Sequence, residues 1–264
     1  EFFRENNPVL RHTVLRRRAT LEEQGLLEKV GVDVHPNPDA ESGTYKGVTF
    51  DGLGLLTNHP FNLAYKAAEE FTALLKKRTK SAGFMKTLLL QRICSSFRSG
   101  IKTAEKLLSH QELNDNEETI ELSFLTEMTP EESSQLKIII NELSRPEAKD
   151  PKLQAVNYFL NEFKTDGKTW LEHGCIIFSQ YYDTAHWIAE ELAKVLKDEP
   201  VAVYAGVGKS GIFRNEDFAV IEREEIKQSV KNRTVRLVIA TDAACEGLNL
   251  QTLGALINVD LPWN

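Results

Sequence analysis

The sequence predicts an α/β protein, in which a parallel sheet over the last hundred residues follows a mainly helical region. Three observations predict this class. The chain has 264 residues, of which 41% are apolar and 27% charged, as in ordinary globular proteins. From about residue 61 to residue 163, apolar residues recur at helical spacing. After residue 165, apolar runs of four or five residues alternate with longer helical stretches, which is typical of a parallel sheet.

The first 60 residues give weaker signals. A basic cluster at 11–18 precedes a short helical pattern through Leu21, Leu26 and Leu27. Residues 31–60 are rich in Pro and Gly, with Asn and Asp between them. Such a composition predicts irregular structure with one or two short strands.

Helices are expected over most of the next hundred residues. Thr129-Pro130-Glu131-Glu132 is a capping box with Pro at the first helical position, and Asp150-Pro151 repeats this start signal. Segment 112–128 is acidic and is expected to be a loop or an insertion. The apolar positions that define the helical faces are Leu63, Ala67, Phe71, Leu74, Leu75; Met85, Leu89, Ile93, Phe97, Ile101, Ala104, Leu108; and Leu136, Ile139, Ile140, Leu143.

A domain boundary is expected near residue 150, between a helical region (1–150) and a sheet region (151–264). The expected strands are Cys175–Phe178, Val201–Tyr204, Leu237–Ala240 and Ala255–Val259. Helices are expected from Thr184 to Leu196 and around Phe218, Ile221 and Ile226. Right-handed crossovers would bring the carboxyl ends of these strands to one edge, where ligands bind in such sheets.

The charge of the chain is uneven. The net charge is −7, which excludes a uniformly basic surface for nucleic acid. Between Lys66 and Lys106, however, ten Lys or Arg face only three Glu. A basic stripe of this kind suits phosphate contacts, and a solvated helix face is the alternative interpretation.

Several function classes are excluded by simple patterns. No apolar stretch is long enough for a membrane span, and the N-terminus shows no signal peptide, so we expect no membrane partner. The three cysteines, Cys94, Cys175 and Cys245, lie far apart in the sequence, and their number is odd. This pattern favours a reducing, cytoplasmic compartment and argues against a structural zinc site. The histidines show no metal-binding spacing, so we expect no metal site. Because the chain begins without Met and ends at Asn264, directly after a predicted strand, we expect it to be a piece of a longer protein.

The most specific segment is 237–251, LVIATDAACEGLNLQ. A buried strand ends in Thr241-Asp242, and a short helix with Gly247 follows. Strand-end hydroxyls and free helix N–H groups suit a phosphate oxygen. The alternative is structural, with Asp242 as a helix N-cap and Gly247 as a C-cap. Segment 176–184 repeats the pattern more weakly, since its strand ends in Ser179-Gln180.

One further segment only imitates a phosphate-binding loop. Gly206-Val-Gly-Lys-Ser210 resembles the end of GxxxxGKS, but the first glycine of that motif would be at position 203, which is Val203.

Taken in order, four segments resemble the second RecA-like lobe of superfamily 2 helicases and translocases: IIFSQ, VAVYAG, LVIATDAACEGLNLQ and LINVDLPWN. The GLNLQ ending points to the Swi/Snf-like group. Lys152-Leu153 resembles the entry helix of this lobe in the group, and Val14–Arg17 resembles an element between the two motor lobes. Met85–Ser96 resembles the helical segment that precedes the lobe in bacterial members. The resemblance is sharp over about 175–264.

This resemblance implies ATP hydrolysis coupled to movement along nucleic acid, usually double-stranded DNA that is not unwound. It implies contacts with the nucleic-acid backbone, contacts with the nucleotide, and an interlobe position for two arginines. The expected backbone contacts are Ser179, Gln180, Gly206, Thr241 and Asp242, with Lys86 and Arg92 of the basic stripe. The expected nucleotide contacts are Glu246, Gly247 and Asn249, and the interlobe arginines are Arg16 and Arg17.

The sequence also departs from the pattern of this family. The first lobe, with its phosphate loop and its metal-binding acidic pair, has no counterpart here, and neither has the final motif that carries the arginine finger. We therefore expect no catalytic residue in this chain, and expect that ATP and its Mg²⁺ are held by the first lobe of the same protein. The chain alone should not hydrolyse ATP.

Two other functions are alternatives. One is a noncatalytic module, with a degenerate motor lobe, that binds nucleic acid or another protein. The other is a small-molecule enzyme with a dinucleotide-binding fold, which would need GxGxxG after its first strand, and Phe178-Ser179-Gln180 has no such glycine. The sequence leaves the choice between DNA and RNA open.

Overall fold

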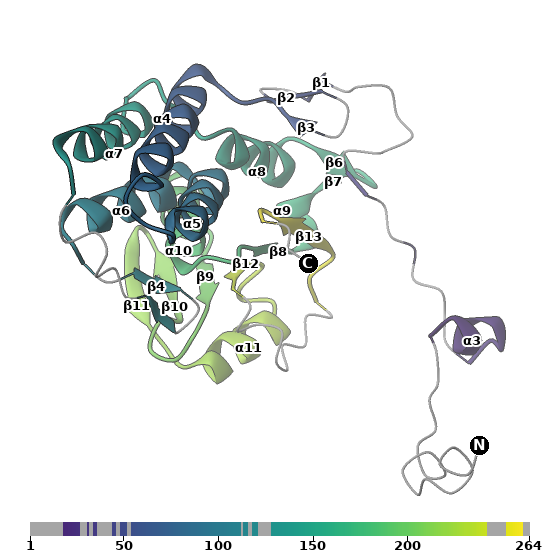
Figure 1. Cartoon of the computed structure of the whole chain (residues 1–264). Coiled ribbons are helices and arrows are strands. Elements are labelled where there is room, and N and C mark those ends of the chain that lie inside the picture. The colour runs from purple at the N-terminus through teal and green to yellow at the C-terminus, as the bar shows by residue number, and fades with distance from the viewer. Residues whose placement is uncertain are drawn as a thin grey trace, which may run out of the picture. The chain divides into compact units, whose positions relative to one another are not determined.

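The computed structural model describes residues 18–26, 31, 34–35, 44–45, 48–51, 54–111, 113–115, 118–120, 128–241 and 252–260. The chain divides into two compact units, Glu1–Glu41 and Ser42–Asn264. The first unit contains helix α3 (Arg18–Glu23). The second unit holds the sheet and the other helices named below (Figure 1).

Four helices form the helical part of the second unit: α4 (His59–Leu75), α5 (Ala82–Ser95), α6 (Phe97–Leu108) and α7 (Pro130–Leu143). The capping box predicted at Thr129 and Glu132 is present at the start of α7. The faces turned inward share one apolar core, in which Phe71, Met85 and Ile139 are fully buried. Helical spacing therefore predicted the packing of this part.

A six-stranded sheet forms the second part, in the order β11-β10-β9-β12-β8-β13. Strands β8 (Cys175–Phe178), β9 (Val201–Tyr204), β12 (Leu237–Ala240) and β13 (Ala255–Asn258) are parallel, at the positions predicted from sequence. In β8, β9 and β12 a continuous apolar composition reflects burial on both faces, whereas β13 is partly exposed. The fold is mixed α/β with a mainly parallel sheet, consistent with a RecA-like lobe.

Helices cover both faces of this sheet. Alternate strand residues point to opposite sides, so Ile177, Val203 and Ile239 pack with α10 (Tyr182–Val195) and α8 (Pro151–Asn161). Ile176, Tyr204 and Val238 pack on the other side with α11 (Arg223–Lys231). The short helix α9 (Trp170–His173) precedes β8. Asp150 caps α8 at the start signal predicted for it. Among the described helices, none is long and apolar enough to cross a membrane.

One expected helix is partly wrong. Phe218 lies in a strand, because β10 (Gly211–Arg214) and β11 (Asp217–Val220) form an antiparallel hairpin at the edge of the sheet next to β9. The helix begins only at Arg223 and includes Ile226. Asn215 and Glu216 both have positive φ, as a two-residue hairpin turn requires. A run of four residues is too short for periodicity to separate a strand from a helix turn.

The smaller strands lie outside the main sheet. In the region expected to be irregular, β1 (Thr44–Tyr45), β2 (Val48–Asp51) and β3 (Gly54–Leu55) pair antiparallel. The acidic segment expected to be a loop contains a hairpin of β4 (Leu113–Asp115) and β5 (Glu118–Ile120). A third hairpin joins β6 (Lys164–Thr165) to β7 (Lys168–Thr169).

The apolar cores change over near residue 150. The core of the helical part draws its buried residues from Ala64 to Leu143, and the two cores beside the sheet draw theirs from Val156 to Val259. Both parts nevertheless belong to the one compact unit. The division at residue 150 into two domains therefore stays a prediction.

Candidate nucleic-acid interface

The carboxyl ends of the parallel strands form one rim of the sheet. Phe178, Ala240, Tyr204 and Asn258 are in register across β8, β12, β9 and β13. The ladder continues one residue further, because Ser179 N–H donates to the carbonyl of Ala240, and Thr241 N–H to that of Tyr204, both at 3.0 Å. The rim thus brings together the ends of β8 and β12, which carry Ser179 and Thr241.

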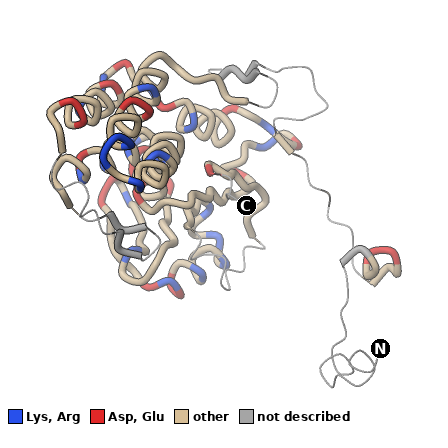
Figure 2. Tube along the Cα trace, viewed as in Figure 1, with Lys and Arg blue, Asp and Glu red and all other residues tan. Residues whose placement is uncertain are grey.

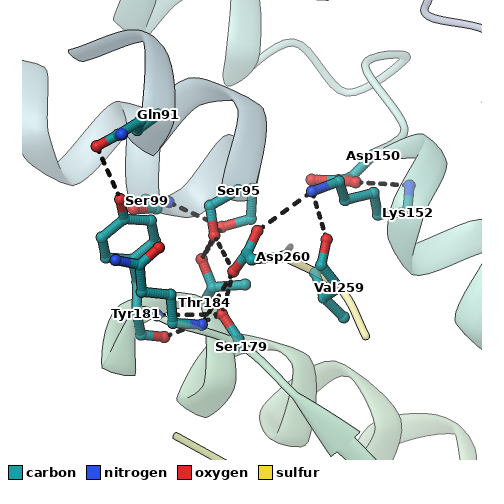
Figure 3. Close-up of polar contacts among 12 residues, drawn as sticks. Gln91, Ser95, Ser99, Asp150, Lys152, Ser179, Tyr181, Thr184, Val259 and Asp260 are labelled. Carbon is teal, nitrogen blue, oxygen red and sulfur yellow. Dashed lines mark hydrogen bonds and ion pairs between the residues drawn. The ribbon is translucent and has the colours of Figure 1, made fainter. Parts of the chain in front are cut away.

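A carboxylate that the sequence analysis did not select lies at this rim. Asp260 follows β13 and receives a hydrogen bond from the Ser179 hydroxyl at 2.6 Å and from Gln180 N–H at 3.2 Å. Lys152 Nζ lies 3.2 Å from its other carboxylate oxygen and donates to the Val259 carbonyl at 2.7 Å. Figure 3 shows Asp260 between Ser179 and Lys152, with dashed contacts to both. Asp260 therefore ties the start of α8 to the end of β8.

The same carboxylate also reaches the helical part. Ser95, the last residue of α5, donates to Asp260 at 2.9 Å. Ser95 and Ser96 both share hydrogen bonds with the Thr184 hydroxyl of α10, at 2.7 and 2.8 Å. All three hydroxyl-bearing residues are essentially inaccessible to solvent, so this is an internal polar junction between α5 and the rim (Figure 3).

A charged pair also joins these two parts. Lys102 of α6 lies 2.8 Å from the Asp183 carboxylate at the start of α10. Burial raises the pKa of Asp183, but the hydrogen bond and charge of Lys102, with the charges of Lys106 and Arg92, outweigh it and leave the pKa below its usual value. Asp183 therefore stays ionised under ordinary conditions.

Asp150 joins the two parts through the backbone. Its carboxylate accepts hydrogen bonds from Phe97 N–H, at the start of α6, and from Lys152 N–H and Leu153 N–H, in the first turn of α8. Burial raises the pKa of Asp150, and these backbone donors oppose the rise. One side chain thus caps α8 and anchors α6.

The predicted nucleic-acid residues fall into different surroundings at the rim. Ser179 is 2% exposed and its hydroxyl is engaged by Asp260. The side-chain oxygen of Gln180 is buried and accepts no hydrogen bond from the described residues. Thr241 is 8% exposed. Gly206 is half-buried in the turn that leads from β9 to β10.

The two residues predicted from the basic stripe also differ. Arg92 is 7% exposed, and its guanidinium lies 3.9 Å from the centre of the Tyr181 ring, so it packs against the start of α10. Lys86 is exposed and pairs with Glu69 at 2.8 Å. The hydrogen bond to Glu69 raises the pKa of Lys86. A nucleic-acid contact by either residue stays a prediction.

The turn from Gly206 to Ser210 does not have the structure of a phosphate loop. It leads into strand β10 and not into a helix, and the Ser210 hydroxyl exchanges hydrogen bonds with the backbone of Ala205, both at 3.0 Å. Nearby, the Arg223 guanidinium lies 5.7 Å from the Tyr204 ring, and its buried Nε has no hydrogen-bond partner among the described residues.

Other predicted residues lie outside the part that the structure describes. These are Arg16, Arg17, Asp242, Glu246, Gly247 and Asn249. Within the described ranges, no group of three or more His, Cys, Asp or Glu is arranged to hold a metal ion. Cys175 is fully buried in β8, and burial raises the pKa of its thiol.

Comparison with known proteins bears on the identity of the sheet region. Residues 152–264 match the family model of the helicase conserved C-terminal domain. No curated protein matches the chain. The matched segment begins at Lys152, the residue that pairs with Asp260, and contains every strand of the six-stranded sheet. The match and the parallel sheet together support the assignment of residues 152–264 as a helicase C-terminal lobe.

Proposed function

We propose that the chain is part of an ATP-dependent nucleic-acid translocase of the Swi/Snf-like group, bacterial in type. In this proposal residues 152–264 are the second motor lobe, which closes on ATP bound to a first lobe and grips the backbone of double-stranded DNA. The observation that supports it is the rim, where the ends of β8 and β12 carry Ser179 and Thr241 within a helicase C-terminal match. Polar groups at such an edge suit a phosphate backbone.

The nucleotide would be shared between the two lobes. Glu246, Gly247 and Asn249 are the proposed contacts from this chain, and Arg16 and Arg17 the proposed interlobe residues. The Gly206–Ser210 turn does not fit the phosphates of ATP, since its serine is already bonded and a strand follows it. We therefore propose that the first lobe binds the phosphates and Mg²⁺, and that the chain alone does not hydrolyse ATP.

A pair of variants at Thr241 tests the rim. Its hydroxyl makes no hydrogen bond within the described residues, so it is free to donate to a phosphate oxygen. Thr241→Val keeps the shape and removes the hydroxyl, whereas Thr241→Ser keeps the hydroxyl. We expect Thr241→Val to weaken duplex binding by about 2- to 10-fold, the value of one neutral hydrogen bond. Thr241→Ser should bind nearly as the parent does.

The measurement is fluorescence anisotropy of duplexes of unrelated sequence. Equal losses on every duplex support a backbone contact, whereas a loss on one sequence indicates base readout and contradicts the proposal. Equal binding by the Val variant and the parent would remove Thr241 from the interface.

A second measurement addresses the motor. The longer protein that contains this lobe should hydrolyse ATP faster with double-stranded DNA, and this chain alone should not hydrolyse it. If the longer protein has no ATPase activity, the noncatalytic module becomes the better description.

A further inference from the structure

A basic pocket lies in the helical part, between the end of α4 and the start of α5. Its volume is about 780 Å³. Five cations and one carboxylate line it: Lys76, Lys77, Arg78, Lys80, Lys86 and Glu69. Figure 2 shows the corresponding run of blue where the chain passes from α4 to α5. A concave surface lined by one sign of charge concentrates counter-ions.

Two of these cations are already neutralised inside the protein. Arg78 makes a two-pronged contact with Glu132, at 2.9 Å through Nε and 2.8 Å through a terminal nitrogen. Glu132 is 1% exposed, so this pair fixes the turn after α4 to the start of α7. Lys86 pairs with Glu69. The contact of Arg78 with buried Glu132 has an evident structural role, and the exposed Lys86–Glu69 pair joins α5 to α4.

The other three cations are not neutralised. Lys76, Lys77 and Lys80 are exposed, and none of them forms an ion pair with any residue that the structure describes. Lys76 and Lys77 follow the carboxyl end of α4, where a positive charge favours the helix dipole. Lys80 has no such reason, because it directly precedes Ser81, the N-cap of α5, where the dipole disfavours a cation. A bound anion would remove this conflict.

Helix α5 links the pocket to the rim. Its first residues, Ala82 and Gly83, line the pocket, and its last residue, Ser95, bonds to Asp260. At 1.5 Å per residue, a helix of 14 residues is about 20 Å long. That length equals about six base pairs of B-form DNA at 3.4 Å each. One duplex is therefore long enough to touch both places.

We propose that this pocket binds the phosphate backbone of double-stranded DNA through Lys76, Lys77 and Lys80, as a contact separate from the rim. The proposal rests on the proposed function for the choice of DNA as the polyanion. It differs from the sequence-based expectation, which selected Lys86 and Arg92, because these two are the residues that the protein pairs or buries.

A salt titration of duplex binding tests the pocket with the full chain. Each phosphate contact contributes about 0.9 to the slope of log K against log salt, between about 50 and 200 mM. The triple variant Lys76→Ala, Lys77→Ala, Lys80→Ala should therefore bind with a slope shallower by about two to three. Lys137→Ala is the matched control, since Lys137 is an exposed lysine of α7 without a described ion pair and does not line the pocket.

A third variant should act in the opposite direction. Glu69→Gln removes the only carboxylate among the residues that line the pocket and releases Lys86. We expect duplex affinity to rise a few-fold at about 100 mM salt, because one more cation can release a counter-ion. Unchanged affinity of the triple variant, or weaker binding by Glu69→Gln, would overturn the proposal.

Acetylation of lysines with and without a duplex separates the pocket from the rim. Lys76, Lys77 and Lys80 should be protected by DNA, and Lys137 should not. Equal acetylation of Lys76, Lys77 and Lys80 in both samples would overturn the proposal that the pocket binds DNA. The same holds if the parent chain binds no duplex at low salt. If Thr241→Val binds as the parent does while the lysines are protected, the rim proposal fails and the pocket proposal stands. If Thr241→Val binds more weakly and the lysines are not protected, the pocket proposal fails and the rim proposal stands.

Discussion

The interiors of the helical part and the sheet part are apolar, whereas the junction between them is polar. Phe71 and Ile177 are each fully buried within their own apolar core. Among the described residues, the contacts from one part to the other include those of Asp260 and Asp150 and the Lys102–Asp183 pair. Apolar contacts follow from patterning and tolerate many partners, but a polar junction requires particular donors opposite particular acceptors. The two parts are thus held in one defined arrangement.

The largest effect should come from the cores. Phe71→Ala and Ile177→Ala should lower the free energy of unfolding by about 3–5 and 2–5 kcal/mol, because each leaves a cavity. Urea denaturation measures both losses. A single transition in both variants would show that the junction couples the two cores, and two separate transitions would show that it does not. A loss below about 1 kcal/mol at either position contradicts the packing described above.

The junction itself should come next. Asp260→Ala removes the carboxylate that accepts from Ser95, Ser179 and Lys152, at an expected cost of about 2–3 kcal/mol, because the lysine can still reach water and the Val259 carbonyl. Ser95→Ala should cost about 1 kcal/mol, since it removes one donor. Hydrogen exchange should be faster at the start of α6 in the Asp260 variant. Unaltered exchange there would argue that Asp260 does not tie the helical part to the rim.

A pair within the helical part should have a smaller, pH-dependent effect. The hydrogen bond from Arg78 lowers the pKa of Glu132, against the opposing effect of burial. A lowered carboxyl pKa stabilises the fold above the unfolded value of about 4.3, and this stabilisation disappears as the pH falls through the folded value. Glu132→Gln should cost about 1–3 kcal/mol at pH 7 and progressively less below pH 4. A cost independent of pH would contradict this assignment.

The smallest effect is expected on the outer surface of α10. Lys194 lies 3.4 Å from Glu190 and 2.7 Å from Glu191, and all three side chains are at least one third exposed. Exposed pairs contribute little, so Lys194→Ala should change the stability by less than about 0.5 kcal/mol. The difference should vanish in high salt. A loss comparable with that of Asp260→Ala would remove the contrast between surface and junction.

The elements that repeat a local pattern were predictable from the sequence. The four parallel strands and the starts of α7 and α8 fall where apolar runs and capping residues predicted them. The hairpin of β10 and β11 was missed, because its strands, GIFR and DFAV, lack the continuous apolar run of the parallel strands and its turn carries Asn215-Glu216 instead of Asn-Gly. A short strand is therefore recognised from the sequence only when its residues form an unbroken apolar run.

The candidate site was predictable only in part. Ser179 and Thr241 were found because each follows a buried strand, and the same rule would have selected Asp260, two residues after β13. Its partners are not local, since Ser95 is 165 residues away in sequence and Ser179 is 81 away. That Lys76, Lys77 and Lys80 form no ion pair with the described residues likewise depends on where Glu69 and Glu132 lie in the fold. Spacing along the chain contains neither fact.

The hairpin beside β9 has a consequence for the behaviour of the chain at high concentration. Without it, the edge of the sheet would be an entirely apolar strand with open backbone groups, a template for aggregation. With it, the edge is β11, four residues long, which begins at Asp217 and follows the charged turn at Glu216. In the neighbouring strand β10, only glycine fits at position 211, because an added Cβ would lie 2.4 Å from the Phe218 ring. Any side chain at position 211 should therefore loosen this protective edge and promote association between copies of the protein.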